Sequence, residues 1–334
     1  MLNSVFVIIG TIIGAGFASG KEIFTFFSVH YFWGLIGLII SELLIGIVIF
    51  KVFSIIIKYN ISSYSAFIKK VLPNSNFINS VVCNIINIFL FISFIVMVAG
   101  FSAYFSQEFN ISYIWGAITI CLLSFFTFLK NINGIIKINT YFIPFLIFII
   151  LLLGFKNLHC FTSLEYTPFA YNISWLLDAL LYASYNLIIT IPILITLGKY
   201  INTLSKAKIV SFVVVFLLLI IAITIFLLLN YYYNDIKTVE LPIVNIASKL
   251  GSTYKYICGF VILIAIFTTA ISSGYSLLSN LNINNYKVYI VASSLICIVA
   301  ICLSNIGFST LLNLLYPILG ILGLIQIFLI FTFI

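Results

Sequence analysis

The residues of this sequence that can do chemistry begin in a run of small residues near its start. Residues 14–20 read Gly-Ala-Gly-Phe-Ala-Ser-Gly, within an apolar stretch from Leu2 to about Phe27, and the charged pair Lys21-Glu22 follows directly. Glycine weakens a helix. In an apolar environment, backbone groups without helical partners must be covered by protein or face a water-filled cavity. The pattern predicts a broken helix whose freed amides and carbonyls bind a ligand.

The two ends of such a break suit different ligands. Amides at the start of a half-helix carry partial positive charge and suit a carboxylate. Carbonyls at the end of the preceding half-helix suit a small cation, and glycine lets a ligand approach the backbone closely. An amino acid or another small carboxylate with a coupling cation would use both ends. In this break we expect solute contacts from Gly14, Ala15, Gly16, Ala18, Ser19 and Lys21.

A second polar interruption lies in a later apolar run. Residues 182–186 read Tyr-Ala-Ser-Tyr-Asn, and Pro192, which removes a helical donor, follows. We expect a second discontinuous helix here, and two broken helices at corresponding places indicate a central binding site. The alternative is a polar turn of an intact helix packed on a neighbour. The solute contacts expected here are Tyr182, Ser184, Tyr185 and Asn186.

Hydroxyl groups cluster in a third apolar run. Residues 268–274 read Thr-Thr-Ala-Ile-Ser-Ser-Gly. Four hydroxyls close together in lipid need partners, and hard cations such as sodium take oxygen ligands of this kind. The alternatives are hydroxyls bonded to carbonyls one turn earlier, or close packing of helices through small residues.

Four charged residues lie within or near the apolar runs. Lys21 is either an outer-gate or solute contact, or a side chain that extends outward to water. Glu22 and Glu42 are the expected proton or cation carriers, although Glu22 could instead cap a half-helix. Glu42 follows small residues that suggest a helix contact, so we expect it to face protein. Asp178 suits the first turn of a helix, and His30 is assigned no role.

The composition indicates what must position these residues. Of 334 residues, 64% are hydrophobic and 7% are charged, with a mean hydropathy of +1.31. A chain this apolar needs lipid as its solvent, so we expect one membrane domain over residues 1–334. The net charge of +8 comes from lysines in short loops, which favours a role in topology over nucleic-acid binding. Metalloprotease, nucleophile-elbow and P-loop motifs are absent from the sequence, so we expect neither an enzyme nor a bound cofactor.

Apolar runs of spanning length recur along the chain. We predict an all-α integral membrane protein with ten spans in two inverted halves, about 2–155 and 173–333, and with its first and sixth helices discontinuous. The connection over 231–255 suggests a short helix over the outer mouth, with a plain surface loop as the alternative. The predicted spans are 2–29, 33–57, 78–106, 112–129, 134–155, 173–197, 209–230, 256–280, 287–303 and 309–333.

Lysine bias predicts the orientation. With the amino terminus inside, ten lysines lie on or near the cytoplasmic side and four lie outside. We therefore expect a multi-pass protein of the cell membrane with both termini in the cytoplasm. The inner lysines are Lys51, Lys58, Lys69, Lys70, Lys130, Lys137, Lys199, Lys206, Lys208 and Lys287, and the outer ones are Lys156, Lys237, Lys249 and Lys255.

The first break resembles a known family. Residues 10–23, Gly-Thr-Ile-Ile-Gly-Ala-Gly-Phe-Ala-Ser-Gly-Lys-Glu-Ile, followed by Phe26-Phe27, are similar to the opening signature of the bacterial YkvI membrane proteins. That family looks like a member of the amino acid–polyamine–organocation superfamily, which has the five-plus-five inverted repeat of LeuT. The resemblance implies that fold for the whole chain.

The resemblance also implies an ion site. In sodium-coupled relatives, carbonyls of the first segment and paired hydroxyls of the eighth hold sodium, and amides at the break meet the substrate carboxylate. The matching groups here are the carbonyls of Gly10, Ile13 and Thr269, the hydroxyls of Ser272 and Ser273, and the amides near Ala15 and Gly16. The chain departs from the neurotransmitter symporters at Phe17 and at residues 21–23, so no substrate is implied.

These observations favour a secondary transporter of a small organic solute, an amino acid or a related compound. It would work by alternating access and be coupled to sodium or to a proton. The alternative is a non-transporting solute sensor or binding protein that uses the same pocket. The sequence carries no indication of the oligomeric state.

Overall fold

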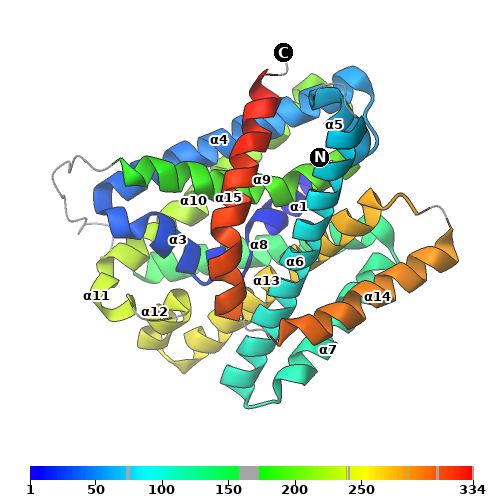
Figure 1. Ribbon diagram of the computed structural model, residues 1–334. Coiled ribbons are helices and arrows are strands. Elements are labelled where there is room, and N and C mark those ends of the chain that lie inside the picture. The colour runs from blue at the N-terminus through cyan, green and yellow to red at the C-terminus, as the bar shows by residue number, and fades with distance from the viewer. Residues whose placement is uncertain are drawn as a thin grey trace.

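The computed structural model describes residues 1–72, 76–157, 173–237, 239, 241–283, 285–305 and 308–332. All regular structure in these ranges is helical (Figure 1). In chain order the helices are α1 (Leu2–Ile12), α2 (Ala15–Ala18), α3 (Lys21–Phe26), the 3-10 helix η1 (Ser28–His30), α4 (Tyr31–Tyr59), α5 (Tyr64–Val71), α6 (Asn76–Phe109), α7 (Tyr113–Phe128), α8 (Asn131–Lys156), α9 (Ser174–Leu197), α10 (Leu204–Tyr231), α11 (Tyr233–Ile236), α12 (Pro242–Leu250), α13 (Ser252–Asn280), α14 (Tyr286–Ser304) and α15 (Phe308–Thr332).

The first segment is broken where the glycines predict it. The helical path stops at Ile13, and Gly14 is extended, with φ −88° and ψ −168°. The four-residue helix α2 follows, and Gly20, at φ +82°, ends it in the left-handed region that glycine adopts without strain. The prediction of a discontinuous first helix is confirmed.

The prediction of a discontinuous sixth helix is wrong, because α9 runs unbroken from Ser174 to Leu197 and through Pro192. Polar side chains of the predicted break bond to carbonyls one turn earlier in the same helix. Ser184 Oγ donates to Leu180 O at 2.5 Å, and Asn186 Nδ2 donates to Tyr182 O at 3.0 Å. Side chains that satisfy themselves in this way do not require the backbone to open.

Within the described parts of the chain, seven helical segments are long and apolar enough to cross a membrane. They correspond to seven of the ten predicted spans and lie at 21–59, 79–106, 131–156, 174–197, 204–231, 252–280 and 286–304. The other three predicted spans fall on the shorter helices α1 and α7 and on α15, of which Gly320–Thr332 is apolar. The count of ten and the division into two inverted halves stay predictions.

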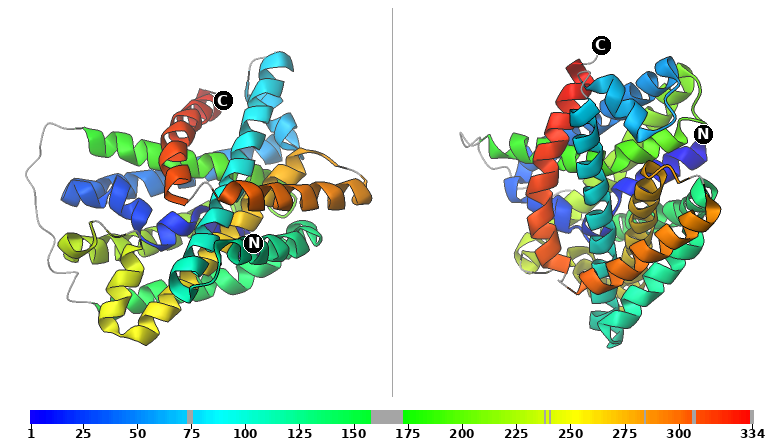
Figure 2. Two further views of the ribbon diagram at one scale, coloured as in Figure 1. Left: turned by 60° about the horizontal axis from the view of Figure 1, so that its bottom comes forward. Right: turned by 45° about the vertical axis from the view of Figure 1, so that its right-hand side comes forward.

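Burial separates central helices from peripheral ones. In the most apolar stretch of each helix, 89% of the residues of α13 and 78% of those of α9 are buried, against 28% of those of α14. The short α1 contacts α8, α9, α10 and α13 and lies at the centre of the bundle (Figure 1). At the periphery, α7 and α14 lie side by side along one edge (Figure 2). The broken first helix therefore packs against both of these central helices, α9 and α13, and also against α8 and α10.

The connection after α10 contains the predicted short helix. Pro242 begins α12, where a missing amide hydrogen costs nothing because the first turn of a helix lacks acceptors for it. The apolar side of α12 is buried through Ile243, Val244, Ile246 and Ala247. We call α11 and α12 the lid. The lid lies beside α3, far from the carboxyl terminus (Figure 1), and Glu240 in the same connection lies outside the described residues.

Candidate functional site

The end of α1 and the middle of α13 meet through one side chain. Thr269 Oγ1 lies 3.1 Å from Gly10 O and 3.2 Å from Ile13 O, and both contacts are buried. These carbonyls lack helical partners because α1 ends here. Gly14 lies directly beside Thr269: a Cβ there would stand 3.5 Å from Thr269 Oγ1, at ordinary van der Waals contact. The structure thus brings together Gly10, Ile13 and Thr269, three of the five residues expected to hold sodium.

The other two, Ser272 and Ser273, are fully buried on the following turn. Ser272 Oγ donates to Thr268 O at 2.9 Å, and Ser273 Oγ donates to Thr269 O at 3.0 Å. These hydrogen bonds to carbonyls one turn earlier are the alternative to cation binding that the sequence analysis left open. A hydroxyl that donates its hydrogen keeps two lone pairs, so these oxygens still have ligand capacity.

Of the solute contacts expected in the first break, Gly14, Ala15, Gly16, Ala18 and Ser19 are all buried. The first amides of α2 have no acceptor within that helix, by helical geometry. Ser19 is used locally, since its hydroxyl donates to Gly16 O at 3.2 Å. Their binding of a carboxylate stays a prediction.

Two buried tyrosines of α9 face the two glutamates expected to carry protons or cations. Tyr182 Oη donates to Glu42 Oε1 at 3.3 Å, and Tyr185 Oη donates to Glu22 Oε2. Phe26 stacks on Tyr185 and meets the edge of Tyr182, with ring centroids 5.9 and 5.8 Å apart. One turn of α9 therefore links carboxyl groups of α3 and α4.

The sequence analysis did not foresee these Tyr–Glu pairs. The spacing of Tyr182 and Tyr185, three residues apart, does place both on one helix face. Ser184 and Asn186, also expected to contact the solute, bond within α9 instead. Glu42 is fully buried, and its second oxygen, Oε2, has no hydrogen-bond partner among the described residues.

The lid closes one end of the break. Ile243 N, in the first turn of α12, donates to Ser19 O at 2.9 Å. A Cβ on Gly20 would lie 3.0 Å from Ile243 Cγ1. The half-buried Lys21 donates from Nζ to Val239 O at 3.3 Å, just before the lid helix. Lys21 therefore contacts the connection that covers the break, and its role as an outer gate stays a prediction.

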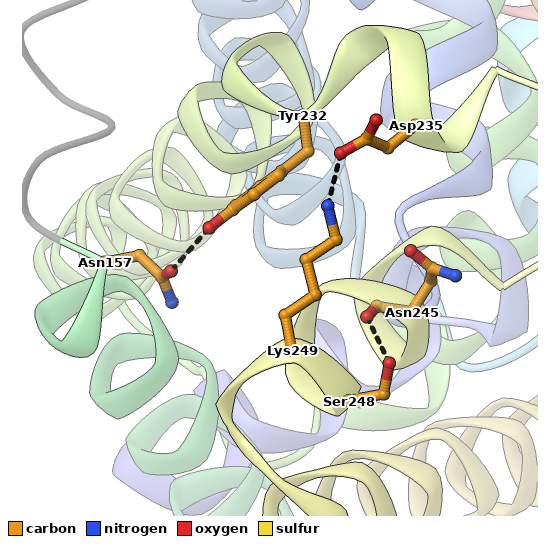
Figure 3. Close-up of polar contacts among 6 residues, drawn as sticks. All are labelled: Asn157, Tyr232, Asp235, Asn245, Ser248 and Lys249. Carbon is orange, nitrogen blue, oxygen red and sulfur yellow. Dashed lines mark hydrogen bonds and ion pairs between the residues drawn. The ribbon is translucent and has the colours of Figure 1, made fainter.

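Polar contacts join the two helices of the lid to each other and to the end of α10 (Figure 3). Lys249 forms an ion pair with Asp235, and its ammonium lies 4.3 Å from the centre of the Tyr232 ring. Tyr232 Oη donates to Asn157 Oδ1 at 3.2 Å, which ties the end of α10 to the end of α8.

A histidine to which the sequence analysis gave no role joins the first and sixth segments. His30 Nε2 lies 2.7 Å from Asp178 Oδ2, within the first turns of α9. This contact and the lid hold the same end of the molecule together, and we call it the lid end.

The opposite end is hollow. A cavity of about 460 Å³ opens there between the ends of α4, α9 and α13. Its polar lining includes Asn60, Lys199, Asn202, Tyr275 and Ser279. Among the described residues, the lid and the His30–Asp178 contact thus hold one end of the molecule together, and the cavity opens at the other.

Comparison with known proteins identifies two relatives of the chain. No family model matches the chain. It is 27% identical to the uncharacterized protein YyaD of Bacillus subtilis (strain 168), over 95% of this chain and 92% of that one. It is 25% identical to the uncharacterized membrane protein YkvI of the same organism, over 96% of this chain and 92% of that one.

A solved structure has the same fold. Mhp1, a nucleobase-cation-symport-1 family transporter in a closed conformation with bromovinylhydantoin bound, superposes with a TM-score of 0.67 at 12% identity. The match covers 95% of this chain and 74% of that one. The resemblance noted in the first break is confirmed: the chain is a homologue of YkvI and YyaD and has the LeuT-like fold.

Proposed function

We propose that this protein is a secondary transporter that moves a small organic solute, an amino acid or a related compound, by alternating access. One observation carries the proposal. The first helix is broken at the centre of the bundle, and its freed carbonyls meet Thr269 of α13. An open backbone at membrane depth serves to bind ligands. The fold shared with a symporter, itself solved with bromovinylhydantoin bound, supports the same function.

The solute would occupy the break between α1 and α2. Its carboxylate would meet the amides of Ala15 and Gly16, beside Gly14, Ala18 and Ser19. Tyr182 and Tyr185 would border the site from α9, with Lys21 between the solute and the lid. Ser184 and Asn186 would take part only if α9 opened there during transport.

Two groups of residues could couple transport to an ion. Sodium would bind the carbonyls of Gly10, Ile13 and Thr269 with the hydroxyls of Ser272 and Ser273. A proton would bind Glu42 or Glu22, each of which already accepts a tyrosine hydroxyl. Buried carboxyl groups in membrane helices commonly serve as proton carriers.

The two ends of the molecule fit alternating access. The lid, Lys21 and the His30–Asp178 pair close one end, whereas the cavity opens the other. The solute would leave or enter through the cavity and, after rocking of the helices, through the lid. With the orientation predicted from the lysine bias, the cavity and both termini would face the cytoplasmic side of the cell membrane.

Thermal stabilisation of the purified protein tests the proposal. A ligand that binds only the folded state raises its apparent stability. A panel of amino acids and related solutes is measured in sodium and in potassium at equal ionic strength. We expect one solute class to stabilise the protein, and the same class to be taken up by proteoliposomes. No stabilisation by any solute would contradict the proposal.

The same assay separates the two ions. If sodium is coupled, solute stabilisation requires sodium and is weakened by the double variant Ser272→Ala/Ser273→Ala. If a proton is coupled, stabilisation is equal in both salts and uptake follows an imposed pH gradient.

A further inference from the structure

A deep apolar groove lies on the flank of the bundle, away from the break and the cavity. It has a volume of about 510 Å³ and is bounded by α6, α7, α8 and α13. Phe101, Phe142 and Phe267 form part of its wall. Its rim is exposed: Phe126 is 60% and Phe260 52% accessible. In a membrane-spanning helix bundle such a rim faces lipid.

Two lysines line one end of this groove. Lys130 lies in the turn between α7 and α8, and Lys137 lies in the second turn of α8. Both side chains are exposed, and no ion pair or side-chain hydrogen bond within the described ranges joins either ammonium to protein. An apolar groove that ends at two free cations has the charge pattern of an acyl chain joined to an anionic headgroup.

The length of the groove fits one leaflet. From Thr119 to Lys130, both lining residues, the chain rises roughly 16 Å at 1.5 Å per residue. Half the hydrocarbon thickness of a bilayer is about 15 Å. An acyl chain lying along α7 would therefore place its headgroup at the level of the two lysines.

We propose that this groove is a binding site for an anionic phospholipid, with one acyl chain in the groove and the phosphate group between Lys130 and Lys137. The assignment does not depend on the transported solute or on the coupling ion, because none of the groove residues belongs to the proposed solute or ion sites.

Lipid titration of the purified protein in detergent tests this site. The probes are phosphatidylglycerol and phosphatidylcholine with identical chains, and the readout is thermal stabilisation. Each lysine near a headgroup contributes about 1 kcal/mol, so phosphatidylglycerol should bind roughly 30-fold more tightly. Glycerol phosphate, which has the charge without the chains, should have no effect.

Two pairs of variants locate the site. Lys130→Gln/Lys137→Gln should remove the preference for phosphatidylglycerol, whereas Lys208→Gln/Lys287→Gln, exposed lysines outside the groove, should retain it. Leu123→Trp, which fills the groove, should weaken both lipids. Its neighbour Leu122, 52% exposed but outside the groove, is the control as Leu122→Trp.

Three results would overturn the assignment. Equal binding of the two lipids to the wild-type protein would remove the anionic preference. A preference that survives Lys130→Gln/Lys137→Gln would place the headgroup elsewhere. Stabilisation that depends on protein concentration and not on lipid would indicate a second copy of the chain in the groove.

Discussion

At the scale of single residues, the hydroxyl of Thr269 decides how the break is held. It has one hydrogen and two carbonyl acceptors, Gly10 O at 3.1 Å and Ile13 O at 3.2 Å. One hydroxyl can donate fully to only one of them at a time. The second carbonyl oxygen is left with lone pairs that accept no full hydrogen bond, and a cation could bind them.

Replacement of Thr269 by Val should destabilise the protein and make it more responsive to sodium. The variant keeps the side-chain shape but leaves two buried carbonyls without a donor, at a cost of about 1–3 kcal/mol. If sodium binds these carbonyls, it should recover part of that loss, so the sodium-minus-potassium difference in Tm should exceed that of the wild type. Thr269→Ser, which keeps the hydroxyl, is the control. An unchanged difference would exclude sodium from this site.

Replacement of Glu42 by Gln tests proton coupling. The amide oxygen can still accept the Tyr182 hydroxyl, so we expect the protein to fold, but the side chain can no longer release a proton. Uptake driven by a pH gradient should be lost, while exchange of labelled solute across the membrane without a gradient continues. Glu108→Gln, at the Lys255 ion pair, is the control. Gradient-driven uptake that survives in Glu42→Gln would assign coupling to another group.

The sequence predicted which residues belong to the site better than it predicted which residues contact one another. The family resemblance grouped Gly10, Ile13 and Thr269, and the structure brings them together through the Thr269 hydroxyl, whereas the resemblance implied its carbonyl. The Tyr–Glu pairs could not be predicted, because their members lie 140 and 163 residues apart and only the packing of α9 on α3 and α4 joins them.

At the scale of elements, the two predicted breaks differ in how the chain can compensate. The first break has three glycines in seven residues, and glycine offers no side chain to replace a lost backbone bond. In α9 the polar residues carry their own donors, and they bond to carbonyls one turn earlier. The hydrophobic pattern is interrupted in both places, so composition alone does not distinguish them. The two places differ in whether the interrupting side chains can donate hydrogen bonds to the backbone.

Substitution of Gly20 by Ala should loosen the lid. A left-handed φ costs an L-residue about 1–2 kcal/mol, and the new Cβ would lie 3.0 Å from Ile243 Cγ1. The hydrogen bond from Ile243 N to Ser19 O should open more often, which hydrogen exchange of α12 measures. Gly37→Ala makes a contact of similar closeness, 3.2 Å to Trp175 O, on an ordinary helix outside the lid. Its α12 exchange should match the wild type. Unchanged exchange in Gly20→Ala would mean that the lid is not held by this contact.

At the scale of the whole molecule, the lid end and the cavity lie at opposite ends of the central helix α9. The lid covers the start of α3, whereas the cavity lies where α4, α9 and α13 end. Lysine bias predicts which end faces the cytoplasm, but the sequence carries no sign of which end is open. That property depends on the relative tilt of helices, and hydrophobic periodicity reports only which face of each helix is buried.

Access to the cavity should therefore depend on the side of the membrane and on the solute. Ser279 lines the cavity and is partly exposed. In a cysteine-free background, Ser279→Cys should react with a membrane-impermeant thiol reagent in inside-out vesicles and not in right-side-out vesicles.

A solute that shifts the helices towards the lid-open state should slow this labelling, because a ligand shifts the population towards the state that it binds more tightly. Ser293→Cys, fully buried in α14, should stay unlabelled and reports on unfolding. Labelling of Ser279→Cys only in right-side-out vesicles would invert the orientation derived from the lysines, and labelling from both sides would mean that the lid end is not closed.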